Sequence, residues 1–380
     1  MLHFDFERLR SMGLTPALIQ QAELLAAGQS PVAADVCATP ADPATAANAG
    51  AWPLLRLTEV HRDRVRLHDG AVEHAAQVLP RLMRALTEQD TALAVGDWVL
   101  AAPDAHGQWW VAHRVPPQTH LVRRDADGRR HPVASNVDTA LLVMGLDEDF
   151  NLRRLERFIA LVQGRGITPV VVLSKADAVR DAPTLYARVQ QVRQRIPDQM
   201  DLYSVDARDP DTALRLAVHA RPGQTLVLVG SSGAGKSTLT NTLLGAVVQD
   251  TGAVREHDSR GKHTTTARSL LRLPGGACVI DTPGLRALRP DADEGAVAAT
   301  FGDINHLAAQ CRFRNCRHQG EPGCQVREGV DEDRLRNFHK LLREARRDSM
   351  TALERQQQIA AWKARGRAGR QRARQKRGDE

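Results

Sequence analysis

Two stretches of the 380-residue chain contain residue types that hold phosphate groups and read a purine base. The first, "GSSGAGKST", follows an apolar run and fits the phosphate-loop pattern G-x-x-x-x-G-K-S/T. Its glycines let backbone N–H groups turn inward around phosphates, and the helix expected after it adds the partial positive charge of its N-terminus. We expect Lys236 to reach the β- and γ-phosphates and the Ser237 hydroxyl to ligate Mg²⁺. The predicted nucleotide-binding residues of this loop are Gly230, Ser231, Ser232, Gly233, Ala234, Gly235, Lys236, Ser237 and Thr238.

The second stretch, "VVVLSKADAV", is a buried strand that breaks into a loop at Ser174, Lys175, Ala176 and Asp177. A Lys-x-Asp at the carboxyl end of a strand can read guanine. The lysine stem lies along one face of the purine, and the carboxylate accepts the ring N–H and the exocyclic amine. Adenine does not present that pair of donors. "SVDA" at 204–207 can supply a backbone contact to the guanine carbonyl.

Two further segments complete a nucleotide site. Asp281 ends an apolar strand in "ACVIDTPGL" and begins an Asp-x-x-Gly sequence that closes at Gly284. A carboxylate at that place contacts Mg²⁺, usually through water, and the glycine N–H senses the γ-phosphate. In "RGKHTTTARS", a polar and basic segment, we expect Thr265 or Thr266 to close onto Mg²⁺ and the γ-phosphate. An ordinary solvent-exposed loop is the alternative for that segment.

These elements follow one another in an unusual order: base loop, phosphate loop, switch threonines, Asp-x-x-Gly. In an ordinary GTPase the phosphate loop comes first. A parallel sheet gathers its ligand at the carboxyl ends of its strands, so loop geometry matters and chain order does not. Rotating the order is possible where the old termini lie close together. The sequence therefore predicts a circularly permuted GTPase domain.

A cysteine and histidine cluster near the carboxyl end has metal-ligand spacing. It consists of Cys311, Cys316, His318 and Cys324, in the pattern C-x4-C-x-H-x5-C. Three thiolates and an imidazole can close a tetrahedral Zn²⁺ site with no open position, so we expect one structural zinc per chain. Unrelated free cysteines are the alternative. The basic neighbours suited to RNA contact are Arg312, Arg314, Arg317 and His306.

The pattern of expected strands and helices changes along the chain, which predicts a multidomain α/β protein. A formal charge of +7 favours a polyanionic partner, and no run is apolar enough to span a bilayer. The amino terminus lacks the basic-then-apolar order of a signal peptide, so we expect a cytoplasmic location. The expected parts are an N-terminal extension with one helix (16–27) and an Ala/Pro-rich linker (1–51), a small antiparallel barrel or sandwich (52–124), a parallel sheet with helices on both faces (125–290), a helical metal-binding segment (291–347) and a basic tail (348–380).

Over roughly residues 52–345 the chain resembles the circularly permuted small ribosomal subunit biogenesis GTPases, the RsgA/YjeQ family. The resemblance rests on "VGDWV", "SNVDTALLV", "DFNLRRLERF", "SKAD", "GSSGAGKST", "RGKHTTTAR", "DTPGLR" and the Cys/His cluster. It implies an OB-type barrel before the permuted domain and a helical zinc-knuckle domain after it. It also implies a monomeric GTPase that binds GTP and GDP and acts on the 30S subunit and its 16S rRNA late in maturation, with no DNA or membrane partner.

Three positions depart from common GTPase patterns. Ser174 stands where most GTPases have Asn, which removes an amide that braces the base loop, and Asp206 stands where a Ser is usual. Leu285 follows Gly284 where many GTPases use a glutamine to position the attacking water. The resemblance points to His263 as a replacement for that glutamine, and on sequence alone a surface histidine is an equal alternative.

Two other functions remain open from the sequence. One is a zinc-stabilised RNA-binding protein in which the nucleotide is only structural, and the other is a P-loop ATPase or kinase that happens to carry Lys-x-Asp. The tail "KARGRAGRQRARQKRG" (363–378) has no acidic residue and would neutralise phosphates, which gives salt-dependent RNA affinity. A solvated tail that binds nothing in particular is the alternative there.

Overall fold

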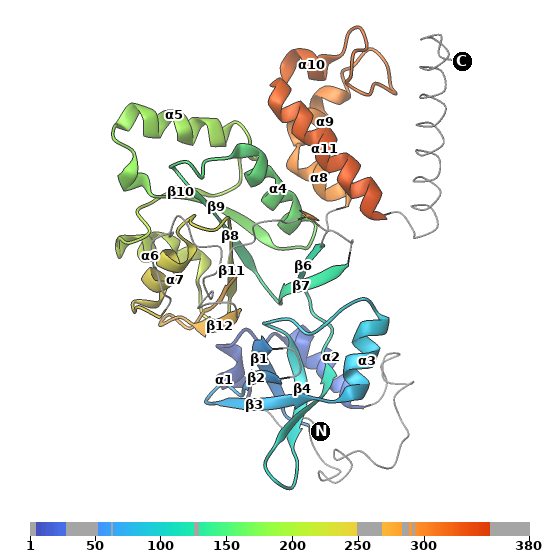
Figure 1. The fold of residues 1–380 in the computed structure, drawn as a ribbon, viewed down its shortest axis with the longest axis vertical. Helices are drawn as coiled ribbons and strands as arrows, with labels where there is room; N and C mark the ends of the chain where they lie inside the picture. Colours follow the sequence, from blue (N-terminus) through green and yellow to red (C-terminus); the bar gives the residue numbers. More distant parts are fainter. Residues whose placement is uncertain are drawn as a thin grey trace, which may run out of the picture. The chain divides into compact units, whose positions relative to one another are not determined.

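The computed structural model describes residues 5–27, 52–61, 64–124, 129–248, 268–282, 289–290 and 293–349. The chain divides into two compact units, Met1–Pro290 and Asp291–Glu380 (Figure 1). No helix among the described residues is long and apolar enough to cross a membrane.

The first unit contains a closed five-stranded barrel. Its elements are β1 (Leu54–His61), β2 (Arg64–His68), β3 (Glu73–Val78), α3 (Pro80–Glu88), β4 (Trp98–Pro103) and β5 (Trp109–Arg114). The strands pair in the order β1-β2-β3-β5-β4, and β4 pairs with β1 again to close the ring. Alternating residues such as Val65 and Leu67 point inward, because successive side chains of a strand face opposite sides. The predicted OB-type barrel is confirmed, and Trp98 belongs to the core.

Two helices precede the barrel, α1 (Phe6–Arg10) and α2 (Pro16–Ala26). The second is the helix expected from the sequence, while the first was not foreseen. The Arg56 guanidinium on β1 is completely buried and donates to the backbone carbonyls of Met12 and Asn136. Cys278 also contacts this segment, with its Sγ 3.8 Å from the Ser11 carbonyl. The helices therefore pack against both the barrel and the sheet that follows it.

A six-stranded layer, mostly parallel, carries the predicted nucleotide loops. Its strands are β8 (Thr139–Gly145), β9 (Thr168–Ser174), β10 (Leu202–Ser204), β11 (Thr225–Val229), β12 (Ser269–Arg272) and β13 (Cys278–Asp281). They lie in the order β10-β9-β8-β11-β13-β12, with only β12 antiparallel to its neighbour in this layer. β12 also touches the barrel, where Ser269 pairs with Glu59 of β1.

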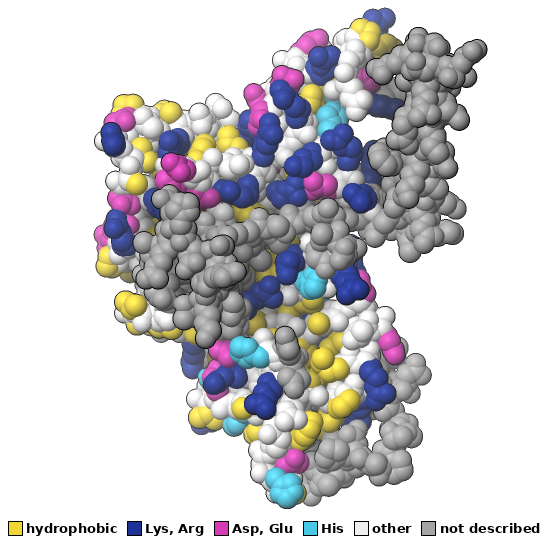
Figure 2. Space-filling model, in the orientation of Figure 1, with side chains coloured by type: hydrophobic (Ala, Val, Ile, Leu, Met, Phe, Trp, Pro, Cys, Tyr) yellow, Lys and Arg dark blue, Asp and Glu magenta, His cyan; other side chains and the backbone are white. Residues whose placement is uncertain are grey.

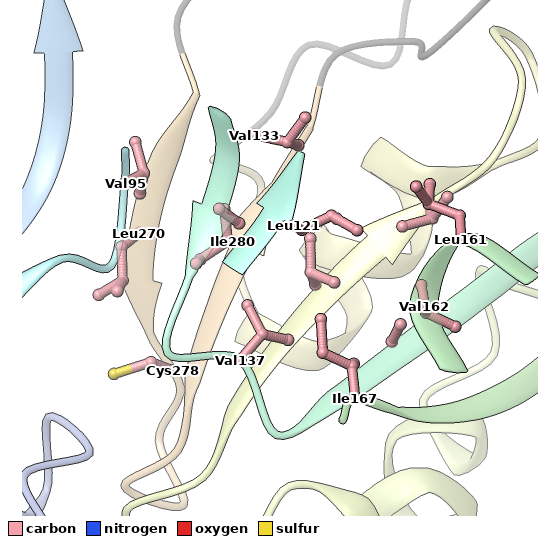
Figure 3. Packing of buried hydrophobic residues seen from close by; sticks show 14 of the residues in the cluster. Val95, Leu121, Val133, Val137, Leu161, Val162, Ile167, Leu270, Cys278 and Ile280 are labelled. Carbon is pink, nitrogen blue, oxygen red and sulfur yellow. The ribbon is translucent and has the colours of Figure 1, made fainter. Parts of the chain in front are cut away.

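Helices cover both faces of this layer. They are α4 (Leu152–Gln163), the 3₁₀ turn η2 (Ala176–Ala178), α5 (Ala182–Arg193), α6 (Asp211–Leu216), the 3₁₀ turn η3 (Ala217–His219) and α7 (Lys236–Leu244). Leu142 of β8 packs in one core cluster with Ile159 of α4, and its neighbour Leu141 packs in the other with Leu239 of α7. Figure 3 shows part of the first cluster. Burial on both faces explains the continuous apolar runs that the sequence shows at these strands.

A small second sheet joins β6 (His120–Arg124), β7 (Arg130–Ser135) and β14 (Arg289–Pro290). β14 pairs antiparallel with β6 through Arg289 and Arg124. The sequence pattern did not separate this sheet from the barrel.

The second unit is helical. It contains α8 (Glu294–Thr300), α9 (Gly302–Ala308), α10 (Gln325–Gly329) and α11 (Glu332–Ser349). Its core is built around Phe301 and Phe338, whose rings meet edge to face at 5.4 Å. Figure 2 shows Lys and Arg side chains gathered over these helices.

Candidate nucleotide and metal sites

The phosphate loop joins β11 to α7 at the carboxyl edge of the sheet. Gly230 allows the loop to leave the strand, because a Cβ there would lie 2.4 Å from the Val143 carbonyl oxygen. Gly235 has a φ of 90° at the start of α7, a conformation that favours glycine. The Lys236 ammonium donates to the Gly230 carbonyl at 3.0 Å and the Ser231 carbonyl at 2.6 Å. The loop is therefore curled around its own lysine, as a phosphate cradle requires.

Lys236, at the start of α7, and Asp281, at the end of β13, are buried charged residues. Burial lowers the pKa of Lys236, while the charges of Asp281 and Asp149 oppose that shift. Burial also raises the pKa of Asp281, and Lys236 opposes it. In the described part of the chain, Oδ1 of Asp281 has no hydrogen-bond partner. A buried carboxylate oxygen left open beside a phosphate loop fits the expected Mg²⁺ water ligand.

The base loop lies at the carboxyl end of β9. Lys175 adopts a left-handed conformation with φ 59°, and the Ala176 N–H donates to the Val205 carbonyl at 3.2 Å. This bond holds the base loop against the segment 204–207, which we assigned from the sequence to the guanine carbonyl. A hollow of about 290 Å³ opens between these loops and the start of α7. Its walls are formed by Lys175, Asp177, Ala178, Asp206, Ala207, Arg208, Gly235 and Thr238.

Ser174 is buried at the junction of the base and phosphate loops. Its hydroxyl donates to the Ala234 carbonyl at 2.6 Å. The sequence predicted a lost brace here, because the usual amide is absent. The structure shows instead that the shorter hydroxyl connects the base loop directly to the phosphate loop.

Arg208 forms part of the wall of the hollow and contacts both of its acidic residues. Its guanidinium lies 2.5 Å from Oδ2 of Asp177 and 3.3 Å from Oδ1 of Asp206. Guanine that binds the Asp177 carboxylate must therefore displace this arginine or share the carboxylate with it. Sequence reasoning about the Lys-x-Asp did not include Arg208.

Several predicted residues cannot be compared with the structure. His263, Thr265, Thr266, Gly284 and Leu285 lie outside the described residues, as does the basic segment 363–378. Their assigned roles stay predictions.

The Cys/His cluster comes together in the second unit. The ligand atoms of Cys311, Cys316, His318 and Cys324 all lie within 4.8 Å of one another. Nδ1 of His318 is 3.7 Å from the Cys311 sulfur and 3.4 Å from the Cys324 sulfur. These spacings are close to the nitrogen-to-sulfur edge of a Zn²⁺ tetrahedron, about 3.6 Å for a Zn–N bond of about 2.05 Å and a Zn–S bond of about 2.3 Å. Burial opposes ionisation of Cys311, but backbone N–H groups of Val326 and Gln325 lower the pKa of its thiol overall.

The fold and the order of its loops define a class of protein: a circularly permuted P-loop GTPase preceded by a closed five-stranded barrel. Two crystal structures share this fold. YjeQ from Thermotoga maritima has a TM-score of 0.56 at 22% identity, covering 77% of this chain and 98% of that protein. YloQ, described as a circularly permuted GTPase, has a TM-score of 0.54 at 21% identity, covering 79% of this chain and 97% of that one.

Sequence comparison gives the particular family. A model of the RsgA GTPase family matches residues 115–290. The small ribosomal subunit biogenesis GTPase RsgA of Xanthomonas axonopodis pv. citri is 46% identical over 295 residues, which cover 75% of this chain and 79% of the relative. The chain therefore belongs to the RsgA family of ribosome biogenesis GTPases and is a GTP hydrolase.

Proposed function

We propose that this GTPase binds the 30S subunit through its 16S rRNA late in maturation and that the subunit stimulates its GTP hydrolysis. The proposed nucleotide binding is supported by the hollow of about 290 Å³, whose walls come from the base loop, residues 206–208 and the phosphate loop. The ribosomal half rests on family membership and on the exposed arginines around the Cys/His cluster. A monomer working in the cytoplasm suits this role.

In this proposal the nucleotide spans the carboxyl edge of the sheet. Lys175 and Asp177 read guanine, and the Ala207 backbone meets its carbonyl. Lys236 and the backbone N–H groups of residues 230–238 hold the phosphates. Mg²⁺ would be held by Ser237, by Asp281 through water and by Thr265 or Thr266, and it supplies neutralisation of the developing phosphate charge. Gly284 senses the γ-phosphate.

Zn²⁺ would be held by Cys311, Cys316, His318 and Cys324 as one structural ion per chain. Four protein ligands leave no open position for a reacting water, so the metal stabilises the second unit and does no chemistry. The exposed side chains of Arg312, Arg314 and Arg317 then lie on a fixed knuckle, where they can contact RNA phosphates.

The direct test measures the rate of GTP hydrolysis alone and with purified 30S subunits, 50S subunits or free 16S rRNA. Stimulation by 30S subunits and not by 50S subunits is expected. Equal stimulation by both subunits would leave a general RNA-activated GTPase and overturn the small-subunit assignment.

Asp177→Asn should shift nucleotide preference from guanine to xanthine. The amide offers a donor where xanthine carries an oxygen in place of the guanine amine, so XDP should gain affinity while GDP loses about 100-fold or more. Equilibrium titration with GDP and XDP checks this. Asp198→Asn is the matched control, because that carboxylate is exposed and lies outside the hollow. Unchanged GDP affinity in Asp177→Asn would remove guanine reading from this loop.

Cys324→Ala should lose the zinc ion and weaken 30S binding, while basal GTP hydrolysis stays within about twofold. The reason is that the cluster lies in the second compact unit and the nucleotide loops lie in the first. Metal analysis, subunit co-sedimentation and hydrolysis assays measure the three effects. Cys278→Ala, the same change in strand β13, should keep its zinc. A native protein without zinc contradicts the assignment.

A further inference from the structure

The loop of residues 146–151, between β8 and α4, touches both halves of the proposed nucleotide site. We call it the bridging loop. Oδ2 of Asp147 accepts from the Lys175 ammonium at 2.6 Å. Oδ1 of Asp149 accepts from the Ser231 hydroxyl, the first side chain of the phosphate loop after Gly230. One short loop thus contacts the base-reading lysine and the phosphate cradle.

The bridging loop is fixed from several sides. The Asp149 N–H donates to Oδ1 of Asp147 at 3.1 Å, and the Gly145 N–H donates to Oδ2 of Asp149 at 3.1 Å. Arg154 of α4 pairs with Asp149 at 2.5 Å, and Arg188 of α5 donates to the Leu146 carbonyl. The two acids therefore reach the nucleotide loops from a rigid support, which is what a positioning residue requires.

Gly145 leaves space for the Asp147 side chain. A Cβ there would lie 2.3 Å from Oδ1 of Asp147. A side chain at position 145 would therefore displace the Asp147 carboxylate from the place where it folds back over the end of the strand.

We propose that Asp147 and Asp149 are positioning residues for GTP binding, Asp147 acting through Lys175 on the base half and Asp149 acting through Ser231 on the phosphate half. This inference rests on the proposed guanine and phosphate subsites. Asp147 fixes the Lys175 ammonium, which orients the alkyl stem along the wall of the hollow where the purine face lies. Without that anchor the long lysine chain would have to be ordered anew at each binding event.

The role of Asp149 follows from what Lys236 does when phosphate arrives. The Lys236 ammonium bonds to the Ser231 carbonyl, and it has to turn from that carbonyl to reach the β- and γ-phosphates. The bond from the Ser231 hydroxyl to Asp149 does not depend on the lysine. It therefore keeps the start of the cradle in place while the lysine changes partners.

An asparagine cannot replace either acid. In both carboxylates each oxygen accepts from its own donors. For Asp147 these are Lys175 on one oxygen and the Asp149 N–H on the other, and for Asp149 they are Ser231 together with Arg154 on one oxygen and the Gly145 N–H on the other. Whichever way an amide is turned, its NH₂ group faces one of those donors. Asp147→Asn and Asp149→Asn should each weaken GDP binding about tenfold, the size of one charge-assisted contact. Glu148→Gln is the matched control, because Glu148 lies between the two acids and is exposed.

Double-mutant cycles test whether Asp147 acts through Lys175 and Asp149 acts through Ser231. Asp147→Asn added to Lys175→Met should cost no further GDP affinity, and Asp149→Asn added to Ser231→Ala should cost none either, whereas the crossed pairs should be additive. A general loss of fold would weaken all pairs alike and lower the unfolding temperature of the zinc-loaded protein. The inference is overturned if both Asn variants bind GDP within twofold of Glu148→Gln, or if the matched pairs are additive. The Asp177→Asn shift toward XDP, measured in the same assay, shows separately whether the guanine assignment itself stands.

Discussion

Lys236→Ala should reduce GTP hydrolysis by about 10³-fold, comparable to removing one preorganised donor from a charge-stabilising site. The ammonium is buried and lies 2.6 Å from the Ser231 carbonyl, inside the loop that cradles the phosphates. No solvent cation can take its place with the same orientation. Affinity for GDP should fall as well, because the lysine also contacts the β-phosphate. Single-turnover hydrolysis and GDP titration measure the two losses.

The control for this change is Lys340→Ala, which removes an exposed lysine of α11 in the second unit. It should hydrolyse GTP at the rate of the unmodified protein. Thermal unfolding of both variants separates lost chemistry from lost fold. Hydrolysis by Lys236→Ala within tenfold of the unmodified rate would mean that the phosphates bind elsewhere.

Much of this fold could be predicted from the sequence because its signals are local. Buried parallel strands give continuous apolar runs such as "TLVLV", and glycine is required where a Cβ would strike the Val143 carbonyl. The Cys/His spacing specified four ligand atoms that the structure does bring together. The order of the loops predicted a permuted sheet, since only the strand ends matter for the ligand.

What could not be predicted depends on contacts between distant segments. In "GLDEDFN" the residues Asp147 and Asp149 are typical of a turn, and the neighbouring sequence does not indicate that their partners are Lys175 and Ser231. Arg208 is one arginine among many until the fold places it against Asp177. The bond from the Ser174 hydroxyl to the Ala234 carbonyl was not foreseen, because the sequence does not show how closely that carbonyl approaches. One feature of the sequence could have indicated their role: the two acids directly follow a strand whose neighbour in the sheet carries the phosphate loop.

The 30S subunit should raise the kcat of GTP hydrolysis by about 10³-fold or more while changing the KM for GTP much less. The sequence supplies the reason. Leu285 follows Gly284 and can neither donate nor accept a hydrogen bond, so it cannot hold the attacking water. Another group has to be ordered, and a partner that binds only the ordered arrangement supplies the free energy for it. GTP itself binds to loops that are already formed in the structure, such as those that line the hollow beside Lys175.

His263→Ala should remove most of the stimulated rate and leave GDP affinity unchanged. A histidine beside the switch threonines is the nearest group in the sequence that can orient water, and no base or phosphate contact is assigned to it. The matched control is His106→Ala, an exposed histidine in the turn between β4 and β5, which should keep the stimulated rate. Suppose that His263→Ala hydrolyses GTP normally with 30S subunits bound. The water would then be positioned by the backbone or by ribosomal RNA, and stimulation by the subunit would stand while the histidine assignment would be wrong.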